Sequence, residues 1–156
     1  MRWTMMMVLV LALTGLSASR AAAQTDQTAV VAVVKKIFDG MRARDTAAMR
    51  ALFAPHARLL GVEAKNGTPS VESLDPTVWL EGIAKGAGKP TYDERIFDPV
   101  VEVDANIAHL WAYYEFWLGP KLSHCGYDSF FLVKLGDAWK VAQVADTRRT
   151  DCKPKG

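Results

Sequence analysis

The residues with the clearest chemical potential lie between Glu115 and Asp128. His124 and Asp128 are four positions apart, so they share one face of any strand that contains both. Gly119-Pro120 predicts a two-residue turn, and counting from it places Glu115 opposite His124. A carboxylate beside an imidazole can act as a general base, which makes His124, Asp128 and Glu115 the candidate catalytic residues. The favoured interpretation is simpler: they are hydrogen-bonded polar groups of an apolar pocket, because buried polar atoms need partners anyway.

Asp146 and Arg148 form a second polar pair, two positions apart and therefore on one face of a strand. A salt bridge at a rim is the favoured interpretation of this pair. The three histidines lack the spacing of metal ligands, so we expect no metal site. The chain has no phosphate-binding loop, no Gly-x-Ser-x-Gly elbow and no zincin motif, and we expect no cofactor.

Strands must position these groups, and strand patterns dominate the second half of the chain. The sequence predicts strands at 92–103, 107–118, 121–135 and 138–148, separated by turns at 104–106, 119–120 and 136–137. Pro99 cannot donate a hydrogen bond within a strand, so we expect a bulge or a sheet edge there.

Helix patterns dominate the first half. Residues 26–44 form an apolar face at helical spacing, made by Val30, Val33, Val34, Ile37, Phe38 and Met41. Asp45 predicts the cap of a short helix over 46–53, and Asp75-Pro76 the start of a third helix. Residues 56–62 predict a strand and 64–73 a polar loop. We summarise the predicted order as ααβαβββ, an α+β fold in which a curved sheet wraps around helices.

When the register is extended from the turns, the side chains of the later strands divide between two faces of the sheet. The predicted inner face mixes bulky aromatic residues with a few polar groups, as ligand pockets do. It holds His109, Trp111, Tyr113, Glu115, Trp117, His124, Asp128, Phe130, Leu132, Trp139, Val141 and Gln143. The candidate ligand-binding residues are Trp79, Trp111, Tyr113, Glu115, His124, Asp128, Phe130 and Gln143, and the expected partner is a small, largely apolar molecule. Trp79, Trp111 and Trp139 are also expected to serve the core first.

The N-terminus has the pattern of a secretory leader. A positive start is followed by an apolar stretch over 5–16, too short to span a bilayer, and Ala21-x-Ala23 fits a signal-peptidase site. We expect residues 1–23 to be a signal peptide, 24–150 one domain and 151–156 a tail, in a periplasmic or secreted protein without a membrane anchor. Removal of Arg2 and Arg20 balances the 19 basic and 17 acidic residues, which argues against a nucleic-acid partner.

Cys125 and Cys152 are the two cysteines of the chain. In an exported protein a disulfide between them is the natural expectation. The predicted register sets Cys125 opposite Arg148, so the tail must turn back to bring Cys152 close enough.

The order of elements resembles the NTF2-like superfamily, whose cone fold is shared by nuclear transport factor 2, ketosteroid isomerase and the SnoaL-like polyketide cyclases. The runs Ser123-His124-Cys125-Gly126 and Asp146-Thr147-Arg148-Arg149 are similar to those of exported bacterial members without an assigned activity. The resemblance implies a homodimer packed through the outer sheet face, at Phe116, Tyr127 or Phe131. It also implies an alternative for Asp146 and Arg148, the Asp–Arg site of epoxide hydrolases in this superfamily.

The resemblance to ketosteroid isomerase does not carry its activity to this chain. The base of that enzyme lies late in the first strand, where this chain has Leu59-Leu60-Gly61-Val62. Three hypotheses therefore remain. They are a binding protein without chemistry, a lyase or isomerase that uses His124 with Asp128 or Glu115, and a structural partner domain whose pocket is filled by its own side chains.

Overall fold

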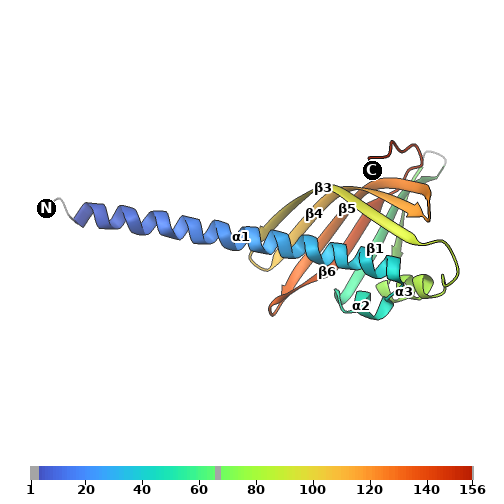
Figure 1. Ribbon diagram of the computed structural model, residues 1–156, viewed down its shortest axis with the longest axis horizontal. Helices are drawn as coiled ribbons and strands as arrows, with labels where there is room; N and C mark the ends of the chain where they lie inside the picture. The colour runs from blue at the N-terminus through green and yellow to red at the C-terminus, as the bar shows by residue number, and fades with distance from the viewer. Residues whose placement is uncertain (1–3, 66–67, 156) are drawn as a thin grey trace.

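A strongly curved sheet with a long helix across its concave side forms the molecule (Figure 1). The computed structural model describes residues 4–65 and 68–155. The helices are α1 (Thr4–Ala43), α2 (Thr46–Arg50) and α3 (Pro76–Ala84). The strands are β1 (Phe53–Lys65), β2 (Thr68–Leu74), β3 (Tyr92–Asp104), β4 (Ile107–Leu118), β5 (Lys121–Leu135) and β6 (Ala138–Thr147). The sheet order is β2-β1-β6-β5-β4-β3, in which β1 and β6 run parallel and the other neighbours antiparallel. The predicted α+β fold is confirmed.

The core lies between α1 and the inner face of the sheet. The predicted apolar face of α1 is buried at Val30, Val34, Ile37, Phe38 and Met41. It packs against sheet residues that are also buried, namely Ala108, Leu110, Ala112, Phe130, Leu132, Trp139 and Val141. Burial of this many apolar side chains against one another is the main favourable contribution to folding.

The two predicted helix caps are present. The carboxylate of Asp45 accepts a hydrogen bond from the amide of Ala48, and that of Asp75 accepts one from Thr77, each satisfying an amide with no partner inside its helix. The predicted extent of the second helix was too long. α2 ends at Arg50 and β1 begins at Phe53, so Pro55 lies in a strand and not after a helix.

The polar loop predicted over 64–73 is largely a strand. β2 pairs antiparallel with β1, from Leu59 opposite Leu74 to Lys65 opposite Thr68. β2 is an exposed edge strand without apolar alternation, so its pairing depends on backbone hydrogen bonds rather than burial. The observed order is therefore ααββαββββ, and β2 is the strand that has no counterpart among the predicted elements.

Bulges in β3, β5 and β6 decide which of the side chains of the later strands face inward. The bulge at Asp98-Pro99 lies on the edge strand β3, as Pro99 predicted. A second bulge adds Ser123 between the pairs Trp117–Leu122 and Phe116–His124, and a third adds Ala142 opposite the junction of Phe131 and Leu132. Each bulge moves the following residues by one position and so exchanges the two faces of the strand.

The first part of α1 projects beyond the sheet (Figure 1), and the part from Asp26 onward contacts it, beginning with the bonds of Asp26 to Lys134 and Trp139. The predicted signal peptide coincides with the projecting part, and its residues 1–3 lie outside the described residues. Within residues 4–65 and 68–155, no helix combines the length and the apolar character needed to cross a membrane.

Candidate functional site

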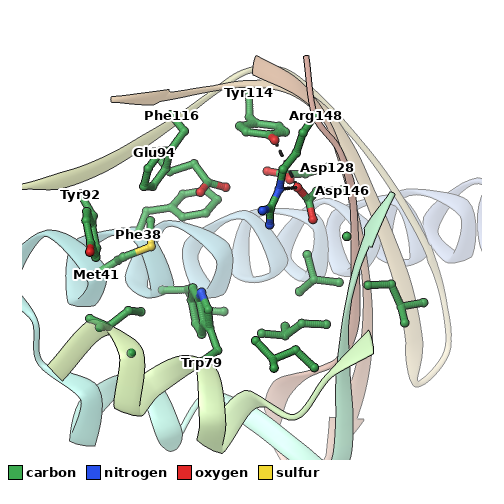
Figure 2. Close-up of a pocket in the computed structure, with 18 of the residues that line it drawn as sticks. Phe38, Met41, Trp79, Tyr92, Glu94, Tyr114, Phe116, Asp128, Asp146 and Arg148 are labelled. Carbon is green, nitrogen blue, oxygen red and sulfur yellow. Dashed lines mark hydrogen bonds and ion pairs between the residues drawn. The ribbon is translucent and has the colours of Figure 1, made fainter. Parts of the chain in front are cut away.

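A cavity of about 560 Å³ lies between the inner face of the sheet, α1 and α3 (Figure 2). Most of its wall is apolar. The helices contribute Ile37, Phe38, Met41, Trp79 and Ile83, and the strands contribute Phe53, Leu59, Leu60, Tyr92, Phe116, Phe130 and Val144. Trp79 meets Phe53 edge to face, with ring centroids 6.2 Å apart, and this contact fixes one wall. The cavity has the size and lining of a small-molecule site.

Ionisable side chains from four adjacent strands meet on the sheet side of this cavity (Figure 2). They come from β3, β4, β5 and β6 and the residues just after β6, and they are Glu94, Tyr114, His124, Asp128, Asp146 and Arg148. Two further carboxylates lie nearby: Glu72 of β2 lines the cavity, and Glu63 of β1 is 3.6 Å from Arg148 Nη1. Carboxylates thus outnumber cationic groups around the cavity.

Asp146 is held by two neighbours. Its Oδ2 atom accepts a hydrogen bond of 2.6 Å from Arg148 Nε and lies 3.2 Å from the Tyr114 hydroxyl. The same hydroxyl lies 2.9 Å from the carbonyl oxygen of Thr147. Burial raises the pKa of Tyr114 further above its ordinary value, so this hydroxyl stays a donor. The predicted Asp146–Arg148 ion pair forms, and both partners line the cavity.

Asp128 and Glu94 make the least ordinary contact of the site. Asp128 is 1% exposed, and no hydrogen-bond donor among the described residues reaches its Oδ2 atom. Glu94 lines the same cavity, and its charge acts on Asp128; two such carboxyl groups can hydrogen-bond only if one of them carries a proton.

The surroundings favour that proton. Burial raises the pKa of Glu94 to about 7, and the charge of Asp146 acts in the same direction. Burial also raises the pKa of Asp128 well above its ordinary value, reinforced by the charges of Glu94 and Asp146. Arg148 opposes both shifts but does not cancel them. A carboxyl pair with raised pKa values can give or take a proton near neutral pH.

His124 closes another side of the cavity. Its ring stacks on Phe116, with centroids 4.8 Å apart, and its Nδ1 atom lies 3.1 Å from the hydroxyl of Ser123. Burial lowers the pKa of His124, and the positive charge of Arg148 lowers it further. The imidazole is thus kept neutral at neutral pH.

The structure brings together only part of the predicted site. Trp79, His124, Asp128 and Phe130 line the cavity, and Trp111, Tyr113, Glu115 and Gln143 do not. The predicted inward placement of these last four was wrong. The predicted turn pairing, Leu118 with Lys121 and Trp117 with Leu122, is observed, but the Ser123 bulge then sets His124 opposite Phe116 and turns the odd-numbered residues of β4 outward. The Ala142 bulge turns Gln143 outward in the same way, and Gln143 is exposed opposite Phe131.

The displaced residues have other roles on the outer face. Trp111 is 43% exposed, contrary to its predicted place in the core, and stacks on Tyr127 with centroids 5.1 Å apart. Tyr113 meets Tyr127 edge to face. Glu115 is fully buried on that face, where it accepts hydrogen bonds from Trp117 Nε1 and from the backbone amide of Lys155. Phe116, predicted to face outward, lines the cavity.

Sequence reasoning missed Glu94 and Tyr114. Tyr114 was assigned to the outer face by the same one-residue error. Glu94 carried a signal that could have identified it: Tyr92, Glu94 and Ile96 alternate along β3, so the carboxylate lies in an otherwise apolar row. A carboxylate in such a row is either paired or functional.

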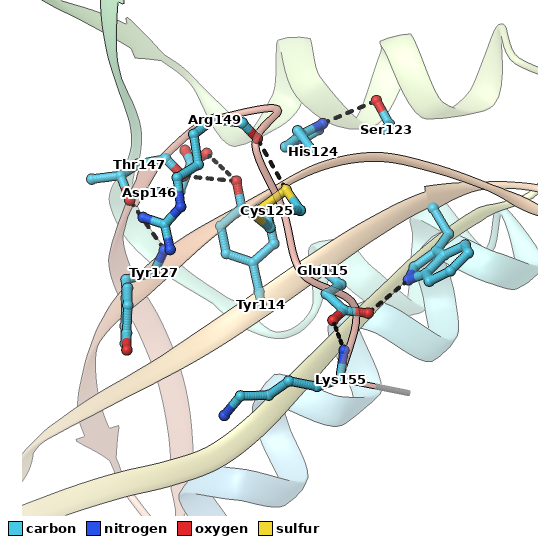
Figure 3. Close-up of a disulfide and its surroundings, with 12 residues drawn as sticks. Tyr114, Glu115, Ser123, His124, Cys125, Tyr127, Asp146, Thr147, Arg149 and Lys155 are labelled. Carbon is cyan, nitrogen blue, oxygen red and sulfur yellow. Dashed lines mark hydrogen bonds between the residues drawn. A yellow bond between two sulfur atoms is a disulfide. The ribbon is translucent and has the colours of Figure 1, made fainter.

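The predicted disulfide is confirmed. Cys125 and Cys152 are bonded, with Cα atoms 5.9 Å apart (Figure 3). Cys125 and Arg149 exchange two backbone hydrogen bonds of 3.0 Å, and Cys152 follows three residues later as the tail turns back. The tail continues across the outer face to Lys155, whose Nζ atom lies 3.2 Å from Asp98. Among the described residues, no three His, Cys, Asp or Glu side chains are arranged to hold a metal ion.

Comparison with solved structures shows where this fold occurs. An NTF2-like protein of Novosphingobium aromaticivorans with a cystatin-like fold superimposes with a TM-score of 0.72 at 10% identity, covering 90% of this chain and 92% of that one. An NTF2-like protein of Shewanella baltica superimposes with a TM-score of 0.61 at 18% identity, covering 81% of this chain and 96% of that one. An NTF2-like protein of Cytophaga hutchinsonii superimposes with a TM-score of 0.61 at 12% identity, covering 77% of this chain and 95% of that one. At these identities the likeness concerns the fold alone.

Comparison by sequence gives the family. No curated protein sequence matches the chain. A protein-family model described as "Putative lumazine-binding" matches residues 25–145, which is most of the chain. The chain therefore belongs to this family, and its fold is the one seen in the NTF2-like proteins above.

Proposed function

We propose that this protein is an exported binding protein for a small molecule with a largely apolar body and a polar end. One observation carries the proposal: the cavity of about 560 Å³ has apolar walls and one ionisable side. A cavity of that kind can bury the body of a ligand and fix its orientation through a few polar groups. A purely structural domain with a filled pocket is disfavoured, because the domain's own side chains leave this volume open.

The family description supports a ligand of this size. Lumazine is a flat bicyclic heterocycle, and such a ring fits between aromatic walls such as Trp79 and Phe38. Our proposal is a ligand of comparable size.

Export is the second part of the proposal. Cleavage near Ala23 would remove the projecting part of α1 and leave the apolar face from Val30 to Met41 in place. The Cys125–Cys152 disulfide is compatible with an oxidising compartment. We also propose that the exported protein is a homodimer that needs no cofactor.

Binding can be tested without knowing the natural ligand. Native mass spectrometry of protein purified from its own periplasm is expected to show a retained small molecule, and the same spectrum reports cleavage and subunit number. Titration with lumazine, followed by Trp fluorescence, tests the family ligand directly.

A cavity-filling variant provides the control. Gly82 lines the cavity, and a Cβ atom there meets no other atom within 4 Å, so Gly82→Leu is expected to fold and to block binding. Glu81→Leu, on an exposed position of the same helix outside the cavity lining, is expected to bind normally. Equal binding by both variants would show that the ligand occupies another place.

A lyase or isomerase is a second candidate, favoured by the raised pKa of Glu94 and Asp128 beside a neutral His124. A general base of this kind would remove a proton from a carbon next to a carbonyl group. Exchange of such protons in 2-tetralone for deuterium, followed by NMR, is expected to be faster with the protein than without it. Acceleration that is lost in Asp128→Asn would support the enzyme. No acceleration by the wild-type protein would support the binding protein instead.

A further inference from the structure

The ionisable side of the cavity has more negative than positive groups. The groups that face Glu94 and Asp128 from the surrounding elements are Glu63, Glu72, Tyr114, His124, Asp146 and Arg148. Arg148 is the cation among them, and its guanidinium is already engaged by Asp146 at 2.6 Å and by Glu63 at 3.6 Å. His124 stays neutral because burial lowers its pKa.

Asp128 is the group whose bonding is incomplete. It is 1% exposed, it lines the cavity, and its Oδ2 atom receives no hydrogen bond from any donor in the described part of the chain. A buried acceptor without a donor costs free energy. The missing element is a donor that enters from the cavity.

We infer that the cavity takes a small apolar molecule carrying a protonated amine, which Glu94 and Asp128 bind. This inference rests on the proposed function of the pocket and adds the chemical class of its ligand. An ammonium group has three donors and one positive charge, so it can serve Asp128 and Glu94 together. The apolar body of the ligand would lie against Trp79 and Phe38.

Binding of an amine by these carboxyl groups depends on pH, because a carboxyl group must be ionised to attract the ammonium charge. Burial holds the pKa of Glu94 at about 7, so below that pH an amine must compete with the bound proton. Above it the pair is more often without the proton, and affinity rises until the amine itself loses its charge. Binding near neutral pH therefore releases a proton to the solvent.

Three probes with one apolar body test the inference by isothermal titration calorimetry. They are 2-naphthylmethylamine, 2-naphthylmethanol and 2-naphthoate, each titrated in phosphate and in Tris buffer at pH 7.5. We expect the amine to bind about 10- to 100-fold more tightly than the alcohol, as charge-assisted hydrogen bonds do, and the carboxylate most weakly. The amine enthalpy is expected to differ between the buffers because a proton is released.

Matched variants locate the effect. Glu94→Gln is expected to remove both the preference for the amine and the difference between buffers. Glu102→Gln, an exposed position on the same strand outside the cavity, is expected to keep both. If Glu94→Gln does not fold, Asp128→Asn serves the same purpose, and circular dichroism establishes which variant is folded.

The outcomes separate the ligand class from the pocket. Equal or tighter binding of the alcohol or the carboxylate, or amine binding with the same enthalpy in both buffers, overturns the amine class and leaves pocket binding intact. Failure of all three probes to bind counts against the pocket function as well. Amine preference that survives in both Glu94→Gln and Asp128→Asn would place the amine elsewhere and overturn the inference.

Discussion

Asp128 of β5 and Asp146 of β6 are paired directly opposite each other, and both face the same cavity. Two like charges at such a position repel each other and destabilise a sheet. Here the two carboxyl groups are stabilised differently: Asp146 is bonded by Arg148 and Tyr114, and burial raises the pKa of Asp128 so that its neutral form is favoured. The site thus keeps three carboxyl groups close together, which is useful for binding or proton transfer and costly for stability.

The first prediction concerns stability against pH. The pKa of Glu94 rises from 4.5 to about 7 on folding, so the folded state binds more protons than the unfolded state between those values. The free energy of unfolding attributable to this group is therefore fully present below pH 4.5 and falls as the pH rises through about 7. Glu94→Gln is expected to lose this dependence and to have a higher Tm than the wild-type protein at pH 8.

Thermal unfolding of wild-type, Glu94→Gln and Glu102→Gln protein at several pH values from 5 to 8.5 checks this. Glu102→Gln removes an exposed carboxylate of the same strand and should follow the wild-type curve. The prediction is contradicted if the Tm of the wild-type protein increases steadily between pH 5 and 8 and Glu94→Gln shows the same increase. In that case Glu94 would not carry a raised pKa.

The disulfide is expected to contribute strongly to stability. It closes a loop with a sequence separation of 27 residues, for which the chain-entropy model gives about 3–4 kcal/mol. The paired variant Cys125→Ser with Cys152→Ser should unfold at a lower urea concentration by a corresponding amount. Equal urea midpoints for the two proteins, with the disulfide of the wild type verified by intact mass, would argue that the tail is held by its other contacts.

A third prediction follows from the close approach of β5 to the end of β6. A Cβ atom on Gly126 would lie 1.8 Å from the carbonyl oxygen of Thr147 and 2.9 Å from the ring of Tyr114. Gly126→Ala must therefore displace backbone beside the Tyr114–Asp146 contact, and overpacking of this kind costs about 1–3 kcal/mol. Gly82→Ala is the control, since its Cβ meets nothing within 4 Å and alanine favours the helix. A neutral effect of Gly126→Ala in urea unfolding would contradict the packing described.

The proposed homodimer leads to a fourth prediction. Tyr127 is 37% and Phe131 39% exposed on the outer face beside Trp111, an apolar surface that a second copy would cover. Phe131→Glu is expected to convert a dimer into a monomer at micromolar concentration, as measured by sedimentation velocity. Val71→Glu, at an exposed apolar position on the edge strand β2, should leave the dimer intact. A wild-type protein that sediments as a monomer removes the proposal.

Local sequence determined most of the elements, with β2 the exception, and much of their chemistry. The apolar face of α1, the Asp45 and Asp75 caps and the turn at Gly119-Pro120 each depend on neighbours within a few residues. The disulfide partners followed from composition alone, because two cysteines allow one pairing. Alternation along β5 was also sufficient to place His124, Asp128 and Phe130 on one face.

Only the tertiary structure decided which strand faces meet. The bulges at Ser123 and Ala142 each insert one residue, and because side chains alternate with a period of two, one residue is enough to turn Glu115 and Gln143 outward and Tyr114 and Phe116 inward. Nothing in the local pattern marks these insertions, because a bulge belongs to the pairing of two strands and not to either strand alone. The meeting of Glu94 with Asp128 likewise depends on how β3, β4 and β5 curve together, a long-range property that no single strand encodes.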